Sequence, residues 1–257
     1  MKSTLKLALL AFFVLLALGL VWSALKVMEL GSSGPSGEKP AGAWTHPLAQ
    51  LDSWTLRRPS QCADPELFKQ EVADSPKGQI WFLDVQSQKN NWVLLCENAS
   101  SSKLFQQWKE GLDFNPLIPF LEAQTNHFFI FNLQSSQAEE AKDFARLTES
   151  LSNSDRMGAM SPSRIPVATL RKERPQWFFG ADGTTWTKVL TLNSLGLRGL
   201  SDLWADFYIL GQREQTALQN QKDLTEFMVQ KNKVLIMEGV RPEELRLPYK
   251  GLLEVKE

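Results

Sequence analysis

Strand-like and helix-like segments alternate along most of this chain, and this alternation strongly limits the folds that it can adopt. Short apolar runs typical of buried strands are separated by segments whose apolar residues recur at helical spacing. Such alternation favours a parallel sheet, either a (β/α)8 barrel or a doubly wound sheet. Nine segments have strand character: residues 53–58, 79–86, 92–96, 127–134, 157–161, 177–180, 207–210, 233–237 and 252–256.

The second and third of these segments, 79–86 and 92–96, are separated by only five residues. A parallel crossover needs about a dozen residues, so we expect this pair to form an antiparallel hairpin. No GxGxxG motif follows the first strand, which counts against a dinucleotide-binding sheet. The sequence therefore predicts an α/β fold for residues 51–257, an irregular (β/α)8 TIM-like barrel with one early β-hairpin.

Helices are expected between the strands, and the first of them begins at Asp64 and Pro65, since proline is favoured at the first helical position. The other predicted helices cover residues 102–110, 116–123, 137–153, 165–174, 187–195 and 214–230, with a short helical turn at 242–245.

An uncharged apolar run precedes the predicted barrel. It extends over 19 residues, from Leu7 to Leu25. At about 1.5 Å per residue this run spans roughly 28 Å, close to the hydrocarbon core of a bilayer. We therefore predict a single transmembrane anchor in residues 1–29, with a cleaved signal peptide as the alternative. Lys2 and Lys6 precede the run, so the positive-inside tendency puts the N-terminus in the cytoplasm and the C-terminal domain outside it, periplasmic or extracellular.

Residues 30–50 are rich in Gly, Ser and Pro and are predicted to be a flexible linker. His46 falls in this segment and is expected to be an exposed linker residue. The only other histidine, His127, opens a predicted strand and is interpreted as structural, because active sites of barrels lie at the opposite strand end.

Composition restricts the partners and metal sites of this chain. The formal net charge is −1, which argues against nucleic-acid binding. Two histidines and two cysteines exclude a multi-histidine metal cluster and a four-cysteine zinc site. Cys62 and Cys96 are both in the exported domain, where a disulfide between them is permitted, and the sequence leaves this pairing open.

The segment FLDVQSQKNNWVLLCEN, residues 82–98, resembles a motif of the glycerophosphodiester phosphodiesterase family. That motif normally reads Glu-Leu-Asp-Val-x-x-Thr-x-Asp-Gly-x-x-Val-x-x-His-Asp. Leu56-Arg57-Arg58 lies where the family has His-Arg-Gly, and Asn132-Leu133-Gln134 is similar to its Glu-Ile-Lys strand. The resemblance implies a (β/α)8 barrel that hydrolyses glycerophosphodiesters with two histidines and a divalent metal.

Several family positions carry other residues in this chain. Leu56 and Cys96 stand where the resemblance implies the two catalytic histidines. Phe82 and Asn132 replace two carboxylates of the implied metal site, and Gln134 replaces a lysine. Imidazole groups suit acid–base catalysis near neutral pH, and carboxylate oxygens suit a hard divalent metal. We therefore assign no catalytic residue, no metal ligand and no cofactor.

The polar residues that remain at these positions are candidate ligand-binding residues: Arg57, Asp84, Glu97, Asn132 and Gln134. The sequence predicts a membrane-anchored exported barrel that is catalytically inactive and binds an unknown phosphodiester-like ligand or an envelope protein. The alternative is a divergent, active phosphodiesterase acting on glycerophosphodiesters or phospholipid head groups, which would need a divalent cation.

Overall fold

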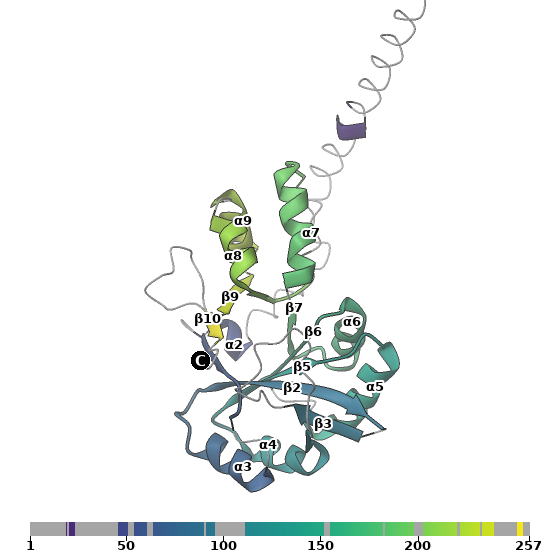
Figure 1. Ribbon diagram of the computed structural model, residues 1–257, viewed down its shortest axis with the longest axis vertical. Helices are drawn as coiled ribbons and strands as arrows, with labels where there is room; N and C mark the ends of the chain where they lie inside the picture. Colours follow the sequence, from purple (N-terminus) through teal and green to yellow (C-terminus); the bar gives the residue numbers. More distant parts are fainter. Residues whose placement is uncertain are drawn as a thin grey trace, which may run out of the picture. The chain divides into compact units, whose positions relative to one another are not determined.

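Eight parallel strands close into a barrel, as the alternation of segments predicts (Figure 1). Closure is achieved because β1 pairs in parallel with β2 on one side and with β10 on the other. In order around the barrel the strands are β1 (Trp54–Arg57), β2 (Ile80–Gln88), β5 (Phe128–Leu133), β6 (Met157–Ser161), β7 (Phe178–Ala181), β8 (Phe207–Leu210), β9 (Val234–Glu238) and β10 (Gly251–Leu253).

The structure is a computed structural model that describes part of the chain. The described residues are 19, 21–23, 46–50, 54–60, 64–89, 91–95, 111–151, 155–181, 183–197, 203–219, 222–231, 233–238 and 251–253. They belong to two compact units. One comprises Lys39–Thr187 with Ala205–Glu257 and holds the barrel, and the other comprises Met1–Glu38 with Lys188–Trp204.

The predicted anchor and most of the predicted linker lie outside the described residues, although Gly19 and residues 21–23 are helical. Among the helices of the described part, none combines the length and apolarity needed to cross a membrane. The second unit also includes the end of α7 (Gly183–Ser194), which Gly196 terminates with a left-handed φ of 68°. There the Leu197 amide donates to the Leu192 carbonyl oxygen, a common helix-ending motif.

The predicted hairpin is confirmed. β3 (Asn91–Leu95) runs antiparallel to β2, and the paired positions extend from Gln88 and Asn91 at the turn to Asp84 and Leu95. Lys89 in the turn has a φ of 49°, within the left-handed region that tight hairpin turns require. A further two-residue strand, β4 (Leu112–Asp113), pairs with β3 and was too short to be predicted.

Most of the described helices follow one strand and precede the next, as expected for this fold, whereas α2 precedes β1 (Figure 1). The segment predicted as one helix over 214–230 contains two helices, α8 and α9, on either side of residues 220–221, which are not described. Predicted helices 102–110 and 242–245 lie outside the described residues. The bounds of the helices other than α7 are α2 (Pro47–Gln50), α3 (Pro65–Ala73), α4 (Ile118–Ala123), α5 (Ala138–Leu147), α6 (Arg164–Glu173), α8 (Gln212–Gln219) and α9 (Lys222–Gln230).

The barrel interior is apolar below the carboxyl ends of the strands. Alternate residues of each strand point inward, because successive side chains of a strand lie on opposite faces. The inward cluster comprises Leu56, Ile80, Phe82, Ile130, Met160, Phe178, Phe207, Ile209, Val234 and Ile236, together with Leu48 of α2.

The expectation that His46 is an exposed linker residue is wrong. His46 is buried, and its ring stacks on that of Phe178, the first residue of β7, with 5.1 Å between ring centroids. The Leu48 amide donates to His46 Nδ1 at 3.2 Å, and the Leu48 side chain is fully buried in the interior cluster. The burial of these apolar surfaces stabilises the segment against the barrel, so packing of the barrel begins before residue 51.

Gly180 on β7 makes room for an aromatic stack inside the barrel. A Cβ atom at position 180 would lie 2.2 Å from the ring of Phe207, and that ring stacks on Phe178 with a centroid separation of 5.6 Å. The Phe207 ring is packed against Phe178 and therefore has little freedom to move away from position 180.

We predict that Gly180→Ala lowers the free energy of unfolding by about 1–3 kcal/mol, the usual cost of overpacking a filled core. The control is Gly211→Ala, where the added methyl group would meet only the flexible end of the Glu214 side chain. Chemical denaturation of both variants measures the difference. Equal losses of stability in the two variants would contradict the steric argument.

Candidate functional site

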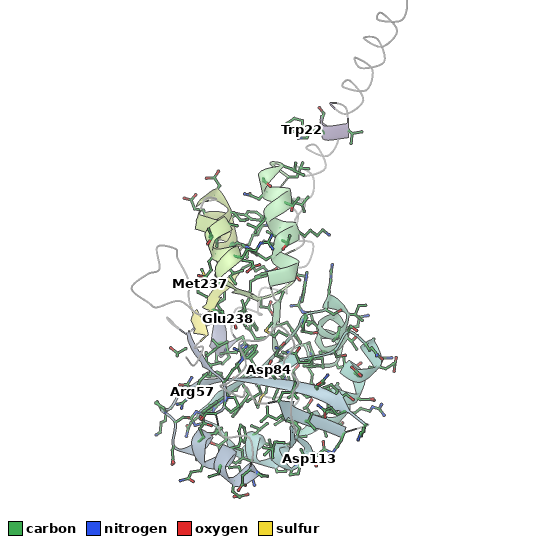
Figure 2. The ribbon with its side chains drawn as sticks, viewed as in Figure 1. Trp22, Arg57, Asp84, Asp113, Met237 and Glu238 are labelled. Atoms are coloured by element: carbon green, nitrogen blue, oxygen red, sulfur yellow. The ribbon has the colours of Figure 1, made fainter. Side chains whose placement is uncertain are left out.

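Polar side chains gather where the parallel strands end, a region that we call the barrel mouth. Asp84 lies on β2 and pairs in register with Asn132 on β5. Glu238 is the last residue of β9, and Arg58 directly follows β1. Asp84 and Glu238, from strands far apart in the sequence, thus lie at the same end of the barrel (Figure 2). Active sites of barrels of this type are built at this end.

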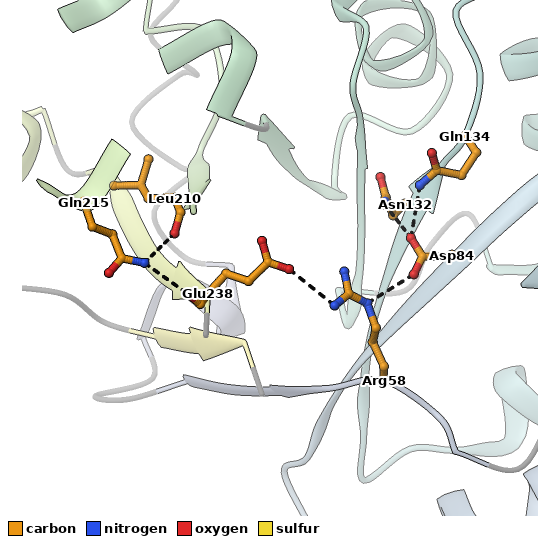
Figure 3. Close-up of polar contacts among 7 residues, drawn as sticks. All are labelled: Arg58, Asp84, Asn132, Gln134, Leu210, Gln215 and Glu238. Carbon is orange, nitrogen blue, oxygen red and sulfur yellow. Dashed lines mark hydrogen bonds and ion pairs between the residues drawn. The ribbon is translucent and has the colours of Figure 1, made fainter. Parts of the chain in front are cut away.

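These residues form one connected set of hydrogen bonds, which we call the mouth network: Arg58, Asp84, Asn132, Gln134 and Glu238 (Figure 3). Asn132 Nδ2 donates to Asp84 Oδ1 at 2.5 Å, and Gln134 Nε2 donates to the same oxygen at 3.1 Å. Arg58 Nε donates to Asp84 Oδ2 at 3.2 Å, so both oxygens of this buried carboxylate accept hydrogen bonds. Arg58 Nη1 also contacts Glu238 Oε1 at 3.4 Å.

Phe82 provides an apolar surface for the arginine of this network. Its ring is buried in the barrel interior, and the Arg58 guanidinium carbon lies 5.1 Å from the ring centroid. A guanidinium at this distance from an aromatic face is attracted by the ring quadrupole. Contacts with two carboxylates and one ring therefore help to hold Arg58 in place.

Glu238 is positioned through its backbone. Gln215 of α8 is buried, and its Nε2 donates to the carbonyl oxygens of Leu210 at 2.7 Å and of Glu238 at 3.1 Å (Figure 3). One amide group thus ties the end of β8 to the end of β9. This contact fixes the strand end from which the Glu238 carboxylate reaches Arg58.

The structure brings together three of the five residues predicted from the sequence: Asp84, Asn132 and Gln134. Glu97 lies outside the described residues, as do Cys62 and Cys96. Arg57 is described, but its side chain contacts other groups. Its Nη2 donates to Glu71 of α3 at 3.3 Å, and its guanidinium lies over the ring of Trp81 at 5.5 Å.

Arg58 and Glu238 were missed by the sequence reasoning, although strand alternation could have found both. Leu56 faces the barrel interior, so Arg58, two residues further on, points to the same side. Ile236 likewise faces the interior, so Glu238 follows it inward at the mouth.

The two histidines of the chain lie at the amino ends of the strands, away from the mouth. His46 stacks on the first residue of β7, and His127 immediately precedes β5. His127 is buried, and within the described part of the chain its Nδ1 has no hydrogen-bond partner. Burial lowers the pKa of His127 below its ordinary value of 6.5, because the charged imidazolium is poorly solvated there.

The divalent metal implied by the family resemblance does not fit the described residues. Phe82 has no ligand atom, and Asn132 directs its amide N–H groups, not its oxygen, toward Asp84. Both Asp84 oxygens are engaged by N–H donors. In the described ranges no group of three or more His, Cys, Asp or Glu side chains is arranged to hold an ion.

The fold defines the class of this protein as an eight-stranded α/β barrel extended by a hairpin. No family model matches the chain, and no curated protein matches it in sequence. Solved structures match it in fold. A candidate glycerophosphodiester phosphodiesterase from Galdieria sulphuraria is 12% identical, with a TM-score of 0.54 over 79% of this chain and 94% of that one.

Two further solved structures give the same result. A glycerophosphodiester phosphodiesterase from Parabacteroides distasonis is 13% identical, with a TM-score of 0.52 over 79% of this chain and 92% of that one. A candidate glycerophosphoryl diester phosphodiesterase from Silicibacter pomeroyi is 9% identical, with a TM-score of 0.51 over 79% and 90%. The predicted resemblance to this family is thus confirmed for the fold.

We predict that His127 makes the fold less stable in acid. Its pKa is lowered in the folded state, so the unfolded chain binds a proton more readily. The stability due to neutral His127 is present above the ordinary pKa and is lost as pH falls through the lower, folded pKa. Going from about pH 7.5 to about pH 5.5 should therefore lower the unfolding free energy more in the wild type than in His127→Gln. Parallel slopes for the two proteins, measured by urea denaturation, would contradict this assignment.

Proposed function

We propose that this chain is an exported, membrane-anchored protein whose phosphodiesterase-like barrel has lost hydrolytic chemistry and serves as a ligand- or protein-binding module. The observation that carries the proposal is the location of the histidines. The chain has two, and both are buried at the amino ends of strands, on the side opposite the mouth. General acid–base catalysis requires such a group within hydrogen-bond reach of the reacting atoms.

The residues at the mouth support the same proposal. Leu56, at a position where the resemblance implies a histidine, is fully buried and belongs to the apolar interior cluster. Arg58 adds a permanent positive charge close to Asp84 and Glu238, but a guanidinium does not release a proton near neutral pH. We infer that a ligand or partner binds at this mouth, near Asp84, Asn132 and Gln134.

The first test is hydrolysis. The full chain, purified in detergent, is expected to release no glycerol 3-phosphate from glycerophosphodiesters above the enzyme-free rate, with magnesium, calcium or manganese present. A known active glycerophosphodiester phosphodiesterase assayed in parallel shows that the conditions permit turnover. The proposal fails if turnover is seen that requires a divalent cation and disappears in Asp84→Ala. The matched control is Asp113→Ala, which removes an exposed carboxylate on β4 (Figure 2).

The second test concerns the anchor. The full chain is expected to remain with membranes after alkaline extraction, while protease added outside intact cells digests the C-terminal domain. Leu15→Arg together with Leu16→Arg should release the chain, since an arginine at the centre of a membrane helix costs about 2.5–3.5 kcal/mol. Thr4→Arg, which precedes the apolar run, is the control and should change nothing. Release of the unmodified chain by alkali, or digestion only after lysis, would refute the anchored, exported topology.

A further inference from the structure

The Arg58 guanidinium lies among groups that would otherwise attract a cation. Its Nε contacts Asp84 Oδ2 at 3.2 Å, its Nη1 contacts Glu238 Oε1 at 3.4 Å, and its face covers the ring of Phe82. The side chain of Arg58 is 21% exposed and that of Asp84 is 9% exposed, so their contact is largely shielded from solvent. Attraction between opposite charges is stronger in such a setting than at the surface.

The charges of the mouth network depend on this arginine. Among the described residues, the network contains two carboxylates, Asp84 and Glu238, and one cation, Arg58. Without the guanidinium, the buried Asp84 carboxylate would keep amide donors from Asn132 and Gln134 but would lose the positive charge beside it. A buried charge left without its partner is strongly unfavourable, and a solvent cation would relieve this.

Two departures from the family pattern are complementary at this point. Phe82 stands where the resemblance implies a carboxylate, and Arg58 stands where it implies a glycine. The first change removes an anionic ligand and supplies an aromatic face, and the second supplies a cation that lies on that face. Each change is costly alone, because a guanidinium needs partners and Asp84 needs a positive charge.

We propose that the Arg58 guanidinium substitutes for a divalent cation at the barrel mouth, and that its removal exposes a latent cation site centred on the Asp84 carboxylate. Asn132 supplies a third oxygen. Its Oδ1 is buried and, in the described part of the chain, makes no hydrogen bond, so rotation of the amide would turn that oxygen toward a cation. Carboxylate and amide oxygens are suitable ligands for calcium and manganese. The inference rests on the proposed loss of phosphodiesterase chemistry and adds that the wild-type mouth excludes divalent cations.

The test compares Arg58→Ala with Arg57→Ala in the full chain. Arg57→Ala is the matched control, because it removes a neighbouring arginine whose side chain contacts Glu71 and Trp81. Thermal unfolding is followed with millimolar calcium or manganese and with sodium chloride of equal ionic strength. Wild type and Arg57→Ala should show no divalent-specific shift. Arg58→Ala should unfold several degrees lower than wild type and regain most of this loss when the divalent ion is added, since binding to the folded state alone stabilises it.

Two further measurements make the result decisive. Adding Asp84→Asn to Arg58→Ala should abolish the divalent-dependent gain, and manganese electron paramagnetic resonance should detect a bound ion in Arg58→Ala and none in the wild type. If Arg58→Ala does not fold, Arg58→Gln replaces it; folding of either variant only when the divalent ion is present supports the proposal. Three outcomes overturn it: a folded variant that does not respond to the divalent ion, failure of both variants to fold when the ion is present, or an ion bound to the wild type through Asp84. Hydrolysis is assayed separately, so absence of a latent site would leave the proposed loss of activity standing.

Discussion

Closure of the parallel sheet is the constraint on which the rest of this structure depends. Because β1 pairs with both β2 and β10, every strand has one face toward a single shared interior. The period of two along a strand then determines which side chains enter that interior. Leu56 and Phe82 are inward, so Arg58 and Asp84 must follow them on the same side, one step nearer the mouth. The mouth network is thus a direct consequence of closure and alternation.

The polar mouth and the apolar interior below it stabilise each other. Phe82, Ile130 and Met160 fill the barrel beneath the network and keep water away from its lower side. In that setting a carboxylate such as Asp84 requires internal partners, which Arg58, Asn132 and Gln134 provide. Glu238 lies nearer to solvent, with its side chain 34% exposed, and is held by its backbone contact with Gln215. The network is therefore rigid at its base and accessible at its rim.

The strands could be predicted from the sequence because their signals are local. Two predicted strands match the structure residue for residue, Met157–Ser161 and Phe207–Leu210. The hairpin could be predicted because only a short segment separates its two strands. Arg57 was predicted as a ligand-binding residue because it matches the arginine of the family motif. Strand alternation instead directs Arg58 toward the mouth. His46 was misplaced for a different reason. Its partner, Phe178, is more than a hundred residues away, so local composition carried no sign of the contact.

All strands of the barrel run in the same direction, and the two histidines lie at their amino ends whereas Arg58 lies at their carboxyl ends. Imidazole is the side chain whose ordinary pKa allows proton exchange near neutral pH, and both imidazoles are buried at the amino ends, where burial favours the neutral form of His127. At the carboxyl ends, Arg58 provides a charge that does not change with pH in the physiological range. The described part of the mouth therefore carries a fixed positive charge but lacks an imidazole that could exchange a proton with a ligand. This separation is the basis of the proposed binding role, because hydrolysis requires protons to be moved as the bond breaks.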